Sequence, residues 1–236
     1  LIAHKGEIQE SYSLKIKDGT VGITDGIFAD CKEITSIDMP NSLKYIGYCS
    51  FWGCSNLSSI IIPSSVINIQ DYAFYACNNL KLVINYSDLE ISKSSHTNGN
   101  IAEYANIAIN ADEQIDNFFF KEREGFYYLS GYIGKEGRLE LPINYKGTNY
   151  SISDYVFSDC LTLTDIIIPN SVTSIGDGAF EDCSGLTNIT IPESVTSIGD
   201  FAFEGCTGLT NITISESVTS IGDSAFEGCT GLTNIT

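Results

Sequence analysis

Histidine is the residue that most often acts as a general base, and this chain of 236 residues contains only two, His4 and His96. Both lie in polar stretches of the kind that form loops. Catalysis by a Ser-His-Asp or Cys-His arrangement needs a histidine that a rigid scaffold holds beside the nucleophile. We therefore predict no catalytic residues and no enzyme activity.

The eight cysteines follow a spacing that argues against metal binding and against a disulfide framework. Seven of them recur at one fixed interval within two blocks, at Cys31, Cys54, Cys77, Cys160, Cys183, Cys206 and Cys229. A zinc site needs clustered pairs such as CxxC, and disulfide frameworks have irregular spacings. A cysteine at one phase of every repeat indicates a small buried hydrophobic residue, so we predict no metal and no cofactor. Cys49 breaks the spacing and is expected to be partly exposed.

One aspartate position also recurs, at Asp25, Asp71, Asp154, Asp177, Asp200 and Asp223. Calcium takes six to eight oxygen ligands, whereas each repeat offers one carboxylate at this position. Aspartate is a good N-cap for a short helix, and we interpret the column in that way. No local pattern nominates a pair of carboxylates for glycoside hydrolysis, although a deep pocket with convergent carboxylates at residues 85–150 would favour a hydrolase.

These residues are positioned by a repeat that is clearest at residues 191–213, which read IPESVTSIGDFAFEGCTGLTNIT, with near-copies immediately before and after. A period of about 23 residues is typical of leucine-rich repeats, in which stacked coils share one core. The LxxIxI pattern of residues 209–214 predicts a strand with Ile212 and Ile214 inward and Asn211 and Thr213 outward. We predict a solenoid with a parallel β-sheet on one face and short helical or 3-10 turns on the other.

The repeat divides the chain into a block at residues 1–84, an irregular stretch at 85–138 and a second block at 139–236. Within the irregular stretch, residues 118–120 and 126–129 flank a Gly turn and predict a β-hairpin. Residues 101–108 have helical spacing. The preferred interpretation is two degenerate coils and a projecting hairpin within one continuous solenoid. The alternative is two solenoid blocks joined at an angle.

The formal net charge is −18, from 12 basic and 30 acidic residues. Nucleic acids and anionic membranes attract basic surfaces, so neither is a predicted partner. No apolar run approaches the ~20 residues of a membrane span, and no signal peptide is visible. Residues 232–236 form a strand without a polar capping repeat, which predicts a longer chain or a covering chain, including end-to-end self-association.

Two surfaces are candidates for binding a protein or a glycan. The first is the concave sheet, which is lined by the outward strand positions Ser36, Asp38, Ser59, Ile61, Asp165, Ile167, Asn188, Thr190, Asn211 and Thr213. The second is the aromatic stretch around Tyr127, Tyr128 and Tyr132. In each case a structural role is the alternative, either a soluble strand face or the core of an irregular junction.

The repeat resembles the BspA-like leucine-rich repeat family of surface proteins. The matching pattern, IPxSVTSIGDxAFxxCxxLTxI, is seen best at residues 168–189 and 191–212, and the resemblance covers about residues 11–84 and 139–236. It implies a right-handed solenoid, secretion or surface display in bacteria or some protists, and adhesion to host or microbial macromolecules. It carries over no catalytic residues and no short ligand motif.

From these observations we expect an extracellular or cell-surface module that binds or adheres to a protein or glycan. The alternative is a structural spacer without a ligand of its own. A hydrolase is the third possibility, and the lack of a poised nucleophile or acid/base pair disfavours it.

Overall fold

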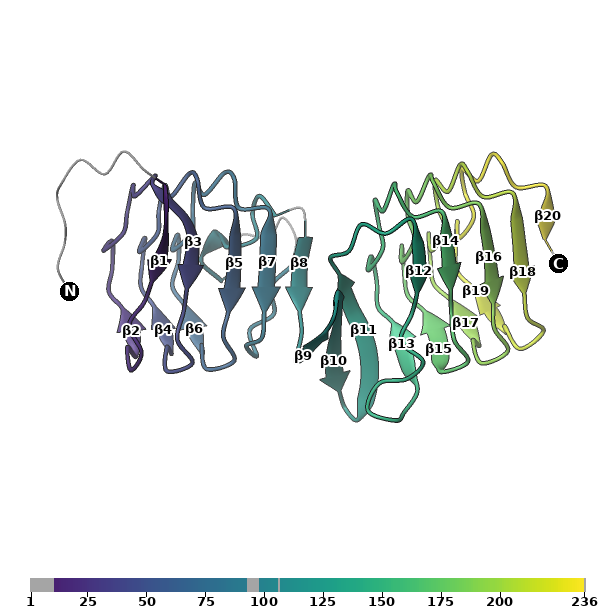
Figure 1. The fold of residues 1–236 in the computed structure, drawn as a ribbon, viewed down its shortest axis with the longest axis horizontal. Coiled ribbons are helices and arrows are strands. Elements are labelled where there is room, and N and C mark those ends of the chain that lie inside the picture. The colour runs from purple at the N-terminus through teal and green to yellow at the C-terminus, as the bar shows by residue number, and fades with distance from the viewer. Residues whose placement is uncertain (1–10, 93–97, 106, 236) are drawn as a thin grey trace. The chain divides into compact units, whose positions relative to one another are not determined.

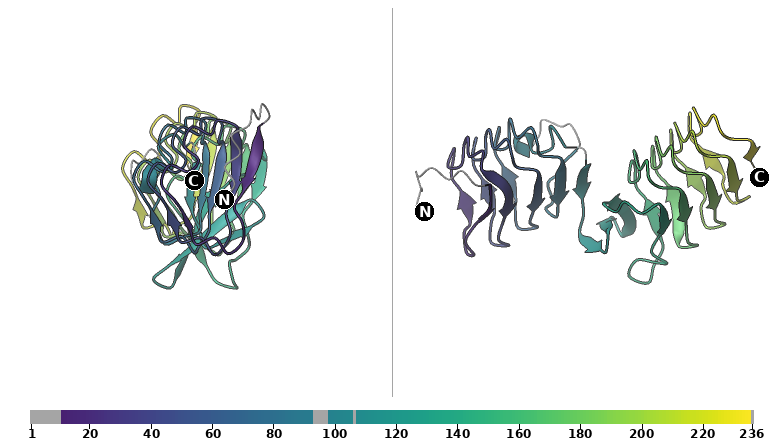
Figure 2. Two further views of the ribbon diagram at one scale, coloured as in Figure 1. Left: turned by 90° about the vertical axis from the view of Figure 1, so that its left-hand side faces the viewer. Right: turned by 45° about the horizontal axis from the view of Figure 1, so that its top comes forward.

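The computed structural model describes residues 11–92, 98–105 and 107–235 (Figure 1). The chain divides into two compact units, Leu1–Asp112 (unit 1) and Glu113–Thr236 (unit 2). Each unit is a β-solenoid of stacked coils, in which strands of successive coils lie side by side (Figure 2). The predicted solenoid fold is therefore confirmed. The predicted boundaries at residues 84 and 138, and the single continuous solenoid, stay predictions.

Each regular coil has three sides, which are a strand with the LxxIxI pattern, a shorter second strand and a turn segment. Strand β16 (Asn188–Ile191) shows why the pattern folds in this way, because Ile189 and Ile191 are buried while Asn188 and Thr190 are exposed. The inward isoleucines of successive coils stack on one another and form one core per unit. The short second strand, such as β17 (Ser197–Ile198), buries one more isoleucine per coil.

Unit 1 contains parallel strands on two sides of the coil. The LxxIxI strands are β1 (Tyr12–Lys15) with β3 (Ile34–Asp38), and β5 (Ser59–Ile62), β7 (Leu82–Asn85) and β8 (Ile107–Asn110). The second strands are β2 (Gly22–Ile23), β4 (Tyr45–Ile46) and β6 (Asn68–Ile69). Partners in β2, β4 and β6 occupy the same repeat position, as in Ile23, Ile46 and Ile69, because each coil repeats the same register.

Unit 2 has two larger sheets. The LxxIxI sheet contains β12 (Arg138–Glu140), β14 (Asp165–Ile167), β16, β18 (Asn211–Ile214) and β20 (Asn234–Ile235). The second sheet contains β9 (Glu113–Ile115), β10 (Phe118–Arg123), β11 (Phe126–Tyr132), β13 (Tyr150–Ile152), β15 (Val172–Ile175), β17 and β19 (Ser220–Ile221). Strands β9, β10 and β11 pair antiparallel, and the later strands are parallel.

The predicted β-hairpin is confirmed by β10 and β11, which pair from Phe118 opposite Tyr132 to Arg123 opposite Phe126. Its turn residues Glu124 and Gly125 both have positive φ, at 53° and 82°. Two successive residues of that kind form a type I′ turn, whose twist matches that of the flanking strands.

On the turn side, where short helical or 3-10 turns were predicted, the repeated DxAF segments form isolated i→i+3 hydrogen-bonded turns and no continuous helix, as in the 2.9 Å bond from the amide of Glu204 to the carbonyl of Phe201. In the coil around Phe203, Phe201 and Gly205 have φ of 56° and 69°. An α-helix needs φ near −63° throughout, so two left-handed residues in one segment interrupt it. Within the described ranges the single helix is the 3-10 helix η1 (Asn98–Asn100). Residues 101–104 are likewise a turn, and strand β8 begins at Ile107, so the helical spacing of residues 101–108 does not correspond to a helix.

The aspartate column connects neighbouring coils instead of capping helices. The carboxylate of Asp177 accepts a hydrogen bond from the amide of Asp200 in the next coil at 2.9 Å, and Asp200 accepts from Asp223 at 2.7 Å. This contact leaves no room for a side chain on the residue that precedes the donating aspartate. A Cβ at Gly199 would lie 2.6 Å from the amide nitrogen of Asp177 and would also meet its carboxylate.

The centre of each unit is a column of stacked phenylalanines beside a column of cysteines. Phe180 and Phe203 are fully buried, and their ring centroids are 5.1 Å apart at an interplanar angle of 4°. The thiol of Cys206 donates to the carbonyl of Phe180 at 3.1 Å. The described cysteines are all unbridged, and Cys54, Cys77, Cys183 and Cys206 are buried while Cys49 is half-buried. The buried-thiol interpretation is confirmed for these four, whereas Cys31, Cys160 and Cys229 of the same column are half-buried. The partial exposure of Cys49 is confirmed.

Two asparagines hold the loop that follows β7, where the regular repeat ends. Asn85 is fully buried, and its amide donates to the side-chain oxygen of Asn110 at 2.7 Å. The same oxygen accepts from the amide of Ile91 at 3.1 Å, and Asn110 donates back to Ile91 at 2.8 Å. A buried polar side chain is stable only when it is paired in this way, so the pair closes the fourth coil without an apolar residue.

Candidate functional site

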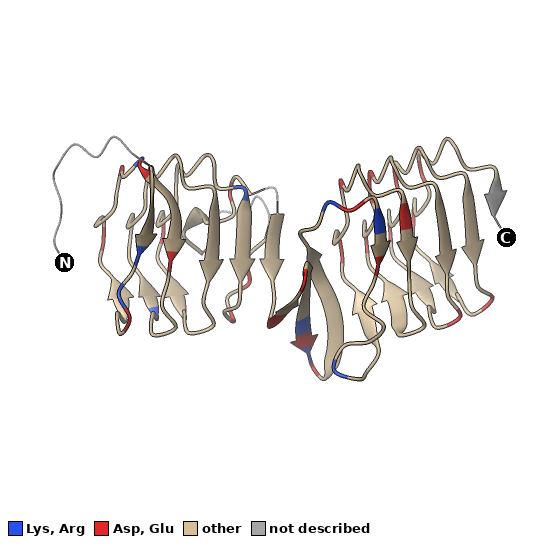
Figure 3. Ribbon diagram, viewed as in Figure 1, with Lys and Arg blue, Asp and Glu red and all other residues tan. Residues whose placement is uncertain are grey.

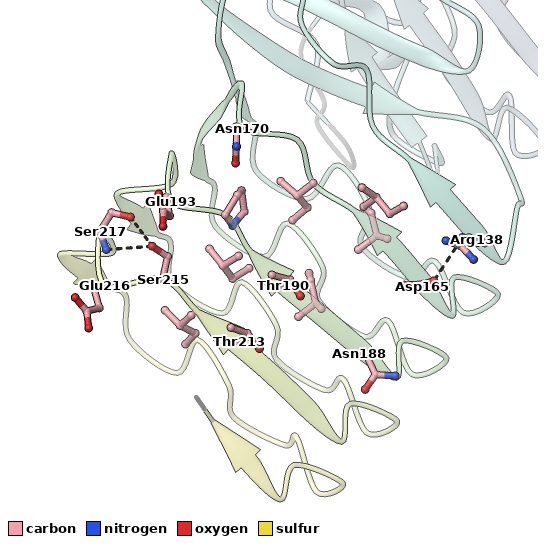
Figure 4. Close-up of a pocket in the computed structure, with 17 residues that line it drawn as sticks. Arg138, Asp165, Asn170, Asn188, Thr190, Glu193, Thr213, Ser215, Glu216 and Ser217 are labelled. Carbon is pink, nitrogen blue, oxygen red and sulfur yellow. Dashed lines mark hydrogen bonds and ion pairs between the residues drawn. The ribbon is translucent and has the colours of Figure 1, made fainter.

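The outward face of the LxxIxI sheet of unit 2 carries a groove of about 1040 Å³ (Figure 4). It crosses β12, β14, β16 and β18 and ends in the loops that follow these strands. The strand pleat turns Asn188, Thr190 and Thr213 outward into the groove, since their neighbours Ile189 and Ile212 occupy the core. Five of the residues predicted for the concave sheet thus line one groove, because Asp165 and Ile167 lie in it as well.

Asn211, the remaining predicted residue of this sheet, lies beside the groove and supports it. Its side-chain amide donates to the side-chain oxygen of Asn188 at 3.0 Å and to the hydroxyl of Thr210 at 3.0 Å. Asn188 in turn donates to Thr187 at 3.1 Å. These bonds order the amides along the strand ends, so the groove presents polar groups in fixed orientations.

The two ends of the groove differ in charge. At the strand starts, Arg138 pairs with Asp165 at 3.6 Å, and both side chains are largely exposed. At the opposite end Glu193 and Glu216 lie in the loops after the strands (Figure 4). Between them the floor carries hydroxyl, amide and methyl groups and the partly exposed Ile167. Such a surface offers neutral hydrogen bonds and apolar contact along its length.

Sequence reasoning missed the contribution of Arg138, Glu193 and Glu216. The interval between Arg138 and Asp165 is longer than the strict period, so the repeat alone did not place Arg138 in the sheet. The register shows that Arg138 is the partner of Asp165 in the neighbouring strand. The signal that would have found Glu193 and Glu216 is the repeat position that they share in successive coils.

The hairpin places the predicted aromatic residues in two environments. Tyr132 belongs to the core, where its ring packs against Phe118 and Phe157 with centroid distances of 5.4 Å in both cases. Tyr127 and Tyr128 are half-buried. Phe126 at the turn is 68% exposed, so the surface of the hairpin is formed by Phe126, Tyr127 and Tyr128.

Tyr127 belongs to a cluster in which two tyrosine rings contact the ammonium group of Lys146. Its ring meets Tyr145 edge to face, with centroids 5.1 Å apart, and the Nζ of Lys146 lies 4.8 Å from the Tyr145 centroid. Lys146 also pairs with Glu113 at 3.3 Å. The hydrogen bond from the Tyr145 hydroxyl, with a further bond from Lys146, holds the pKa of Glu113 below its ordinary value. The cluster therefore joins an ammonium, two rings and a carboxylate.

Acidic residues outnumber basic ones in the sequence, by 30 to 12, and Figure 3 shows their distribution along the ribbon. Across residues 11–92, 98–105 and 107–235, no group of three or more His, Cys, Asp or Glu side chains is arranged to hold a metal ion. In the same part of the chain no helix is long and apolar enough to span a bilayer.

The family described as BspA type leucine rich repeat region matches residues 8–125 and 150–236, with six copies of the repeat. No curated protein matches the chain.

Two solved structures resemble the fold. One is a leucine rich cell surface protein from Faecalibacterium prausnitzii A2-165, with 28% identity and a TM-score of 0.51 over 94% of this chain and 59% of that one. The other is a leucine-rich repeat protein from Bacteroides ovatus, with 28% identity and a TM-score of 0.52 over 94% of this chain and 54% of that one. The chain thus spans less than two thirds of the length of either protein. Since the repeat pattern matches over most of the sequence and the coils stack as the pattern requires, the chain belongs to the BspA-type leucine-rich repeat family.

Proposed function

We propose that this chain is a non-catalytic adhesion module, secreted or displayed on a cell surface, and that it binds a protein or a glycan in the groove of unit 2. The observation that carries the proposal is the row of outward amide and hydroxyl groups at Asn188, Thr190 and Thr213, which lie along a groove of about 1040 Å³. Neighbouring strands are spaced by about 4.8 Å, so the row repeats at regular intervals. An extended ligand that crosses the coils can use several of these groups in turn.

Two comparisons support surface display. The family consists of repeat proteins, whose extended faces commonly bind other macromolecules. The similar protein from F. prausnitzii is described as a cell surface protein. The net charge of −18 suits a partner other than nucleic acid or an anionic membrane.

The groove is tested by filling it. The purified chain is screened against immobilised host matrix proteins and a glycan array, and the affinity of each saturable hit is measured for wild type, Thr190→Tyr and Ile61→Tyr. Ile61 occupies the repeat position of Thr190 in unit 1 and is also exposed, so it is a matched control. We expect Thr190→Tyr to weaken binding at least about tenfold and Ile61→Tyr to leave it unchanged.

Equal losses in the two variants would contradict a site in the groove. Loss confined to Tyr127→Ala and Tyr128→Ala would move the site to the hairpin, which we propose as the second contact surface. Absence of any hit from a folded sample would favour the spacer role. End-to-end self-association stays a prediction, and sedimentation velocity at rising protein concentration tests it.

A further inference from the structure

Four aromatic side chains lie exposed on the turn side of unit 1. Tyr48, Trp52, Tyr72 and Tyr75, here called the aromatic edge, are 48%, 36%, 46% and 38% exposed. They come from two neighbouring coils, since Trp52 and Tyr75 each follow the core phenylalanine of their coil directly. Large exposed aromatic residues gathered in one place commonly mark an interaction site.

The rings are held in a defined arrangement. Tyr48 and Tyr72 meet edge to face with centroids 5.9 Å apart at 83°, and Tyr72 and Tyr75 do so at 5.7 Å and 85°. The backbone fixes the coils that carry them, because the amide of Gly53 donates to the carbonyl of Tyr75 at 2.9 Å. Tyr72 has φ of 57°, which projects its side chain from the turn. Pre-ordered rings lose little entropy when a partner binds.

The charge around the aromatic edge is negative. The segments 47–54 and 70–77 that form it contain Asp71 and no lysine or arginine. The pKa of Tyr48 is raised, chiefly by a hydrogen bond with Cys49 and in part by the nearby carboxylate of Asp71. Lys81 lies at the margin and donates to the carbonyl of Tyr104 at 3.3 Å. Aromatic faces carry negative partial charge, so rings and carboxylate together attract a cation.

Unit 2 contains an occupied version of the same arrangement. Tyr127 and Tyr145 meet edge to face at 72°, and Lys146 lies over both rings, 5.9 Å and 4.8 Å from their centroids, while it pairs with Glu113. In the aromatic edge two ring pairs and a carboxylate are present, yet no lysine or arginine among residues 11–92, 98–105 and 107–235 lies over these rings. The chain thus supplies its own cation to the paired rings of unit 2, and the paired rings of the aromatic edge differ from them in this respect.

We propose that the aromatic edge is a further interaction surface, separate from the groove and the hairpin of unit 2, and that it binds a lysine- or arginine-rich segment of a partner protein. The cationic side chains of the segment lie over the rings of Tyr72 and Tyr75, and Asp71 contributes a charge-assisted contact. A polyanionic ligand such as nucleic acid does not fit, because the surface is itself acidic. The partner is a polypeptide because Tyr and Trp on a surface of this kind are typical of protein contacts.

The probe is a fluorescent peptide of four Arg-Gly units, with the corresponding Glu-Gly and Ser-Gly peptides as references, and binding is measured by fluorescence anisotropy. The variant is Tyr72→Ser combined with Tyr75→Ala. Other coils of this chain already have serine and alanine at these repeat positions, at Ser224 and Ala29, so the backbone accepts them. The control is Phe201→Ser, which removes an exposed ring at the repeat position of Tyr72 in unit 2.

We expect saturable binding of the Arg-Gly peptide, about tenfold weaker for the double variant and unchanged for Phe201→Ser, since none of these changes alters the net charge. Tyr75→Phe, which retains a ring, should bind as wild type does. A dissociation constant of the double variant within twofold of wild type would overturn the proposal, as would equal loss with Phe201→Ser. Binding of chitohexaose that requires Tyr72, without binding of the Arg-Gly peptide, would also overturn it in favour of a glycan.

The test is independent of the groove. Thr190→Tyr should leave Arg-Gly binding unchanged, and the double variant in the aromatic edge should leave any groove ligand bound. Circular dichroism of each variant at the assay temperature confirms that the protein is folded. If one variant lost both Arg-Gly binding and binding of the groove ligand and its spectrum also changed, the variant would be misfolded. If it lost both with an unchanged spectrum, the two ligands would share a binding surface.

Discussion

The turn segments of the two units share one backbone and carry different surfaces. In both units the amide of the core phenylalanine donates to the carbonyl of the alanine in the next coil, at 2.8 Å for Phe51 and at 2.8 Å for Phe180. The residue after the core phenylalanine is Trp52 in unit 1 and Glu181 in unit 2. The stacking of coils constrains the phenylalanine and leaves the residue beside it free to change.

The turn segments also constrain one glycine position, which depends on the aspartate of the preceding coil. In unit 2 the carboxylates of Asp154, Asp177 and Asp200 each accept a hydrogen bond from the next coil. A glycine lies beside each of these carboxylates, as Gly199 does beside Asp177. In unit 1 the column is broken by Tyr48, and the next coil has Gln70 where the coils that receive a carboxylate have glycine. A glycine is needed only where a carboxylate from the preceding coil packs against the turn. Because Tyr48 supplies no carboxylate, the next coil can have Gln70 at the glycine position.

The core columns should be equivalent in the two units. Phe51 and Phe203 are each fully buried between two stacked rings, so Phe51→Ala and Phe203→Ala should each reduce the free energy of unfolding by ~3–5 kcal/mol. Glu204→Ala, next to Phe203, should change it by no more than ~0.5 kcal/mol. Urea unfolding followed by circular dichroism measures these values, and Trp52, the single tryptophan, reports unit 1 by fluorescence. Equal losses for Phe203→Ala and Glu204→Ala would contradict the inside and outside assignment.

The requirement for glycine beside a carboxylate predicts different stability costs for alanine at Gly199 and at Gln70, which occupy the same repeat position. Gly199→Ala should cost ~1–3 kcal/mol, because the new Cβ meets the carboxylate and amide of Asp177. Gln70→Ala should cost less than ~0.5 kcal/mol, since a Cβ is already accommodated there. The shift of the urea midpoint at constant slope measures both. A neutral Gly199→Ala variant would show that the contact relaxes at little cost.

An aspartate at position 48 would restore the aspartate column of unit 1. Tyr48→Asp introduces a carboxylate that can accept from the amide of Asp71, but the side chain of Gln70 occupies the space that a glycine provides in unit 2. We therefore expect Tyr48→Asp to be tolerated better in a Gln70→Gly background, with a coupling free energy of about 1 kcal/mol in a double-mutant cycle. Additive effects of the two substitutions would contradict this explanation of Gln70.

The smallest expected effect is chemical and leaves stability unchanged. Burial raises the pKa of Cys77 in unit 1 and of Cys183 in unit 2 to about 12 in each case, so at pH 8 both are thiols that reagents cannot reach. Cys49 lies outside the column and is half-buried. Iodoacetamide should modify Cys49 in the native protein and the two column cysteines only after unfolding, as peptide mass spectrometry would show. Prompt labelling of Cys183 in folded protein would contradict its placement.

Much of the fold could be predicted because successive coils repeat the same pattern of apolar and polar residues. The alternation of Asn211, Ile212 and Thr213 determined which side of the strand faces the core, since a strand turns successive side chains to opposite faces. The hairpin of residues 118–132 followed from two aromatic runs around a Gly turn. The membership of Asn188, Thr190 and Thr213 in one outward face was likewise determined by their repeat phase.

The second strands, the aspartate hydrogen bonds and the two surfaces depend on contacts between coils. These contacts join residues of different coils, and the sequence alone does not show which of them lie close together. The second strands are two to four residues long in the regular coils, as in β17, and exist only because the next coil supplies the partner. The aspartates became acceptors between coils instead of helix caps, since left-handed residues interrupt each turn segment. The groove at Thr190 and the aromatic edge at Tyr72 both arise from stacking, which brings side chains of successive coils to one surface.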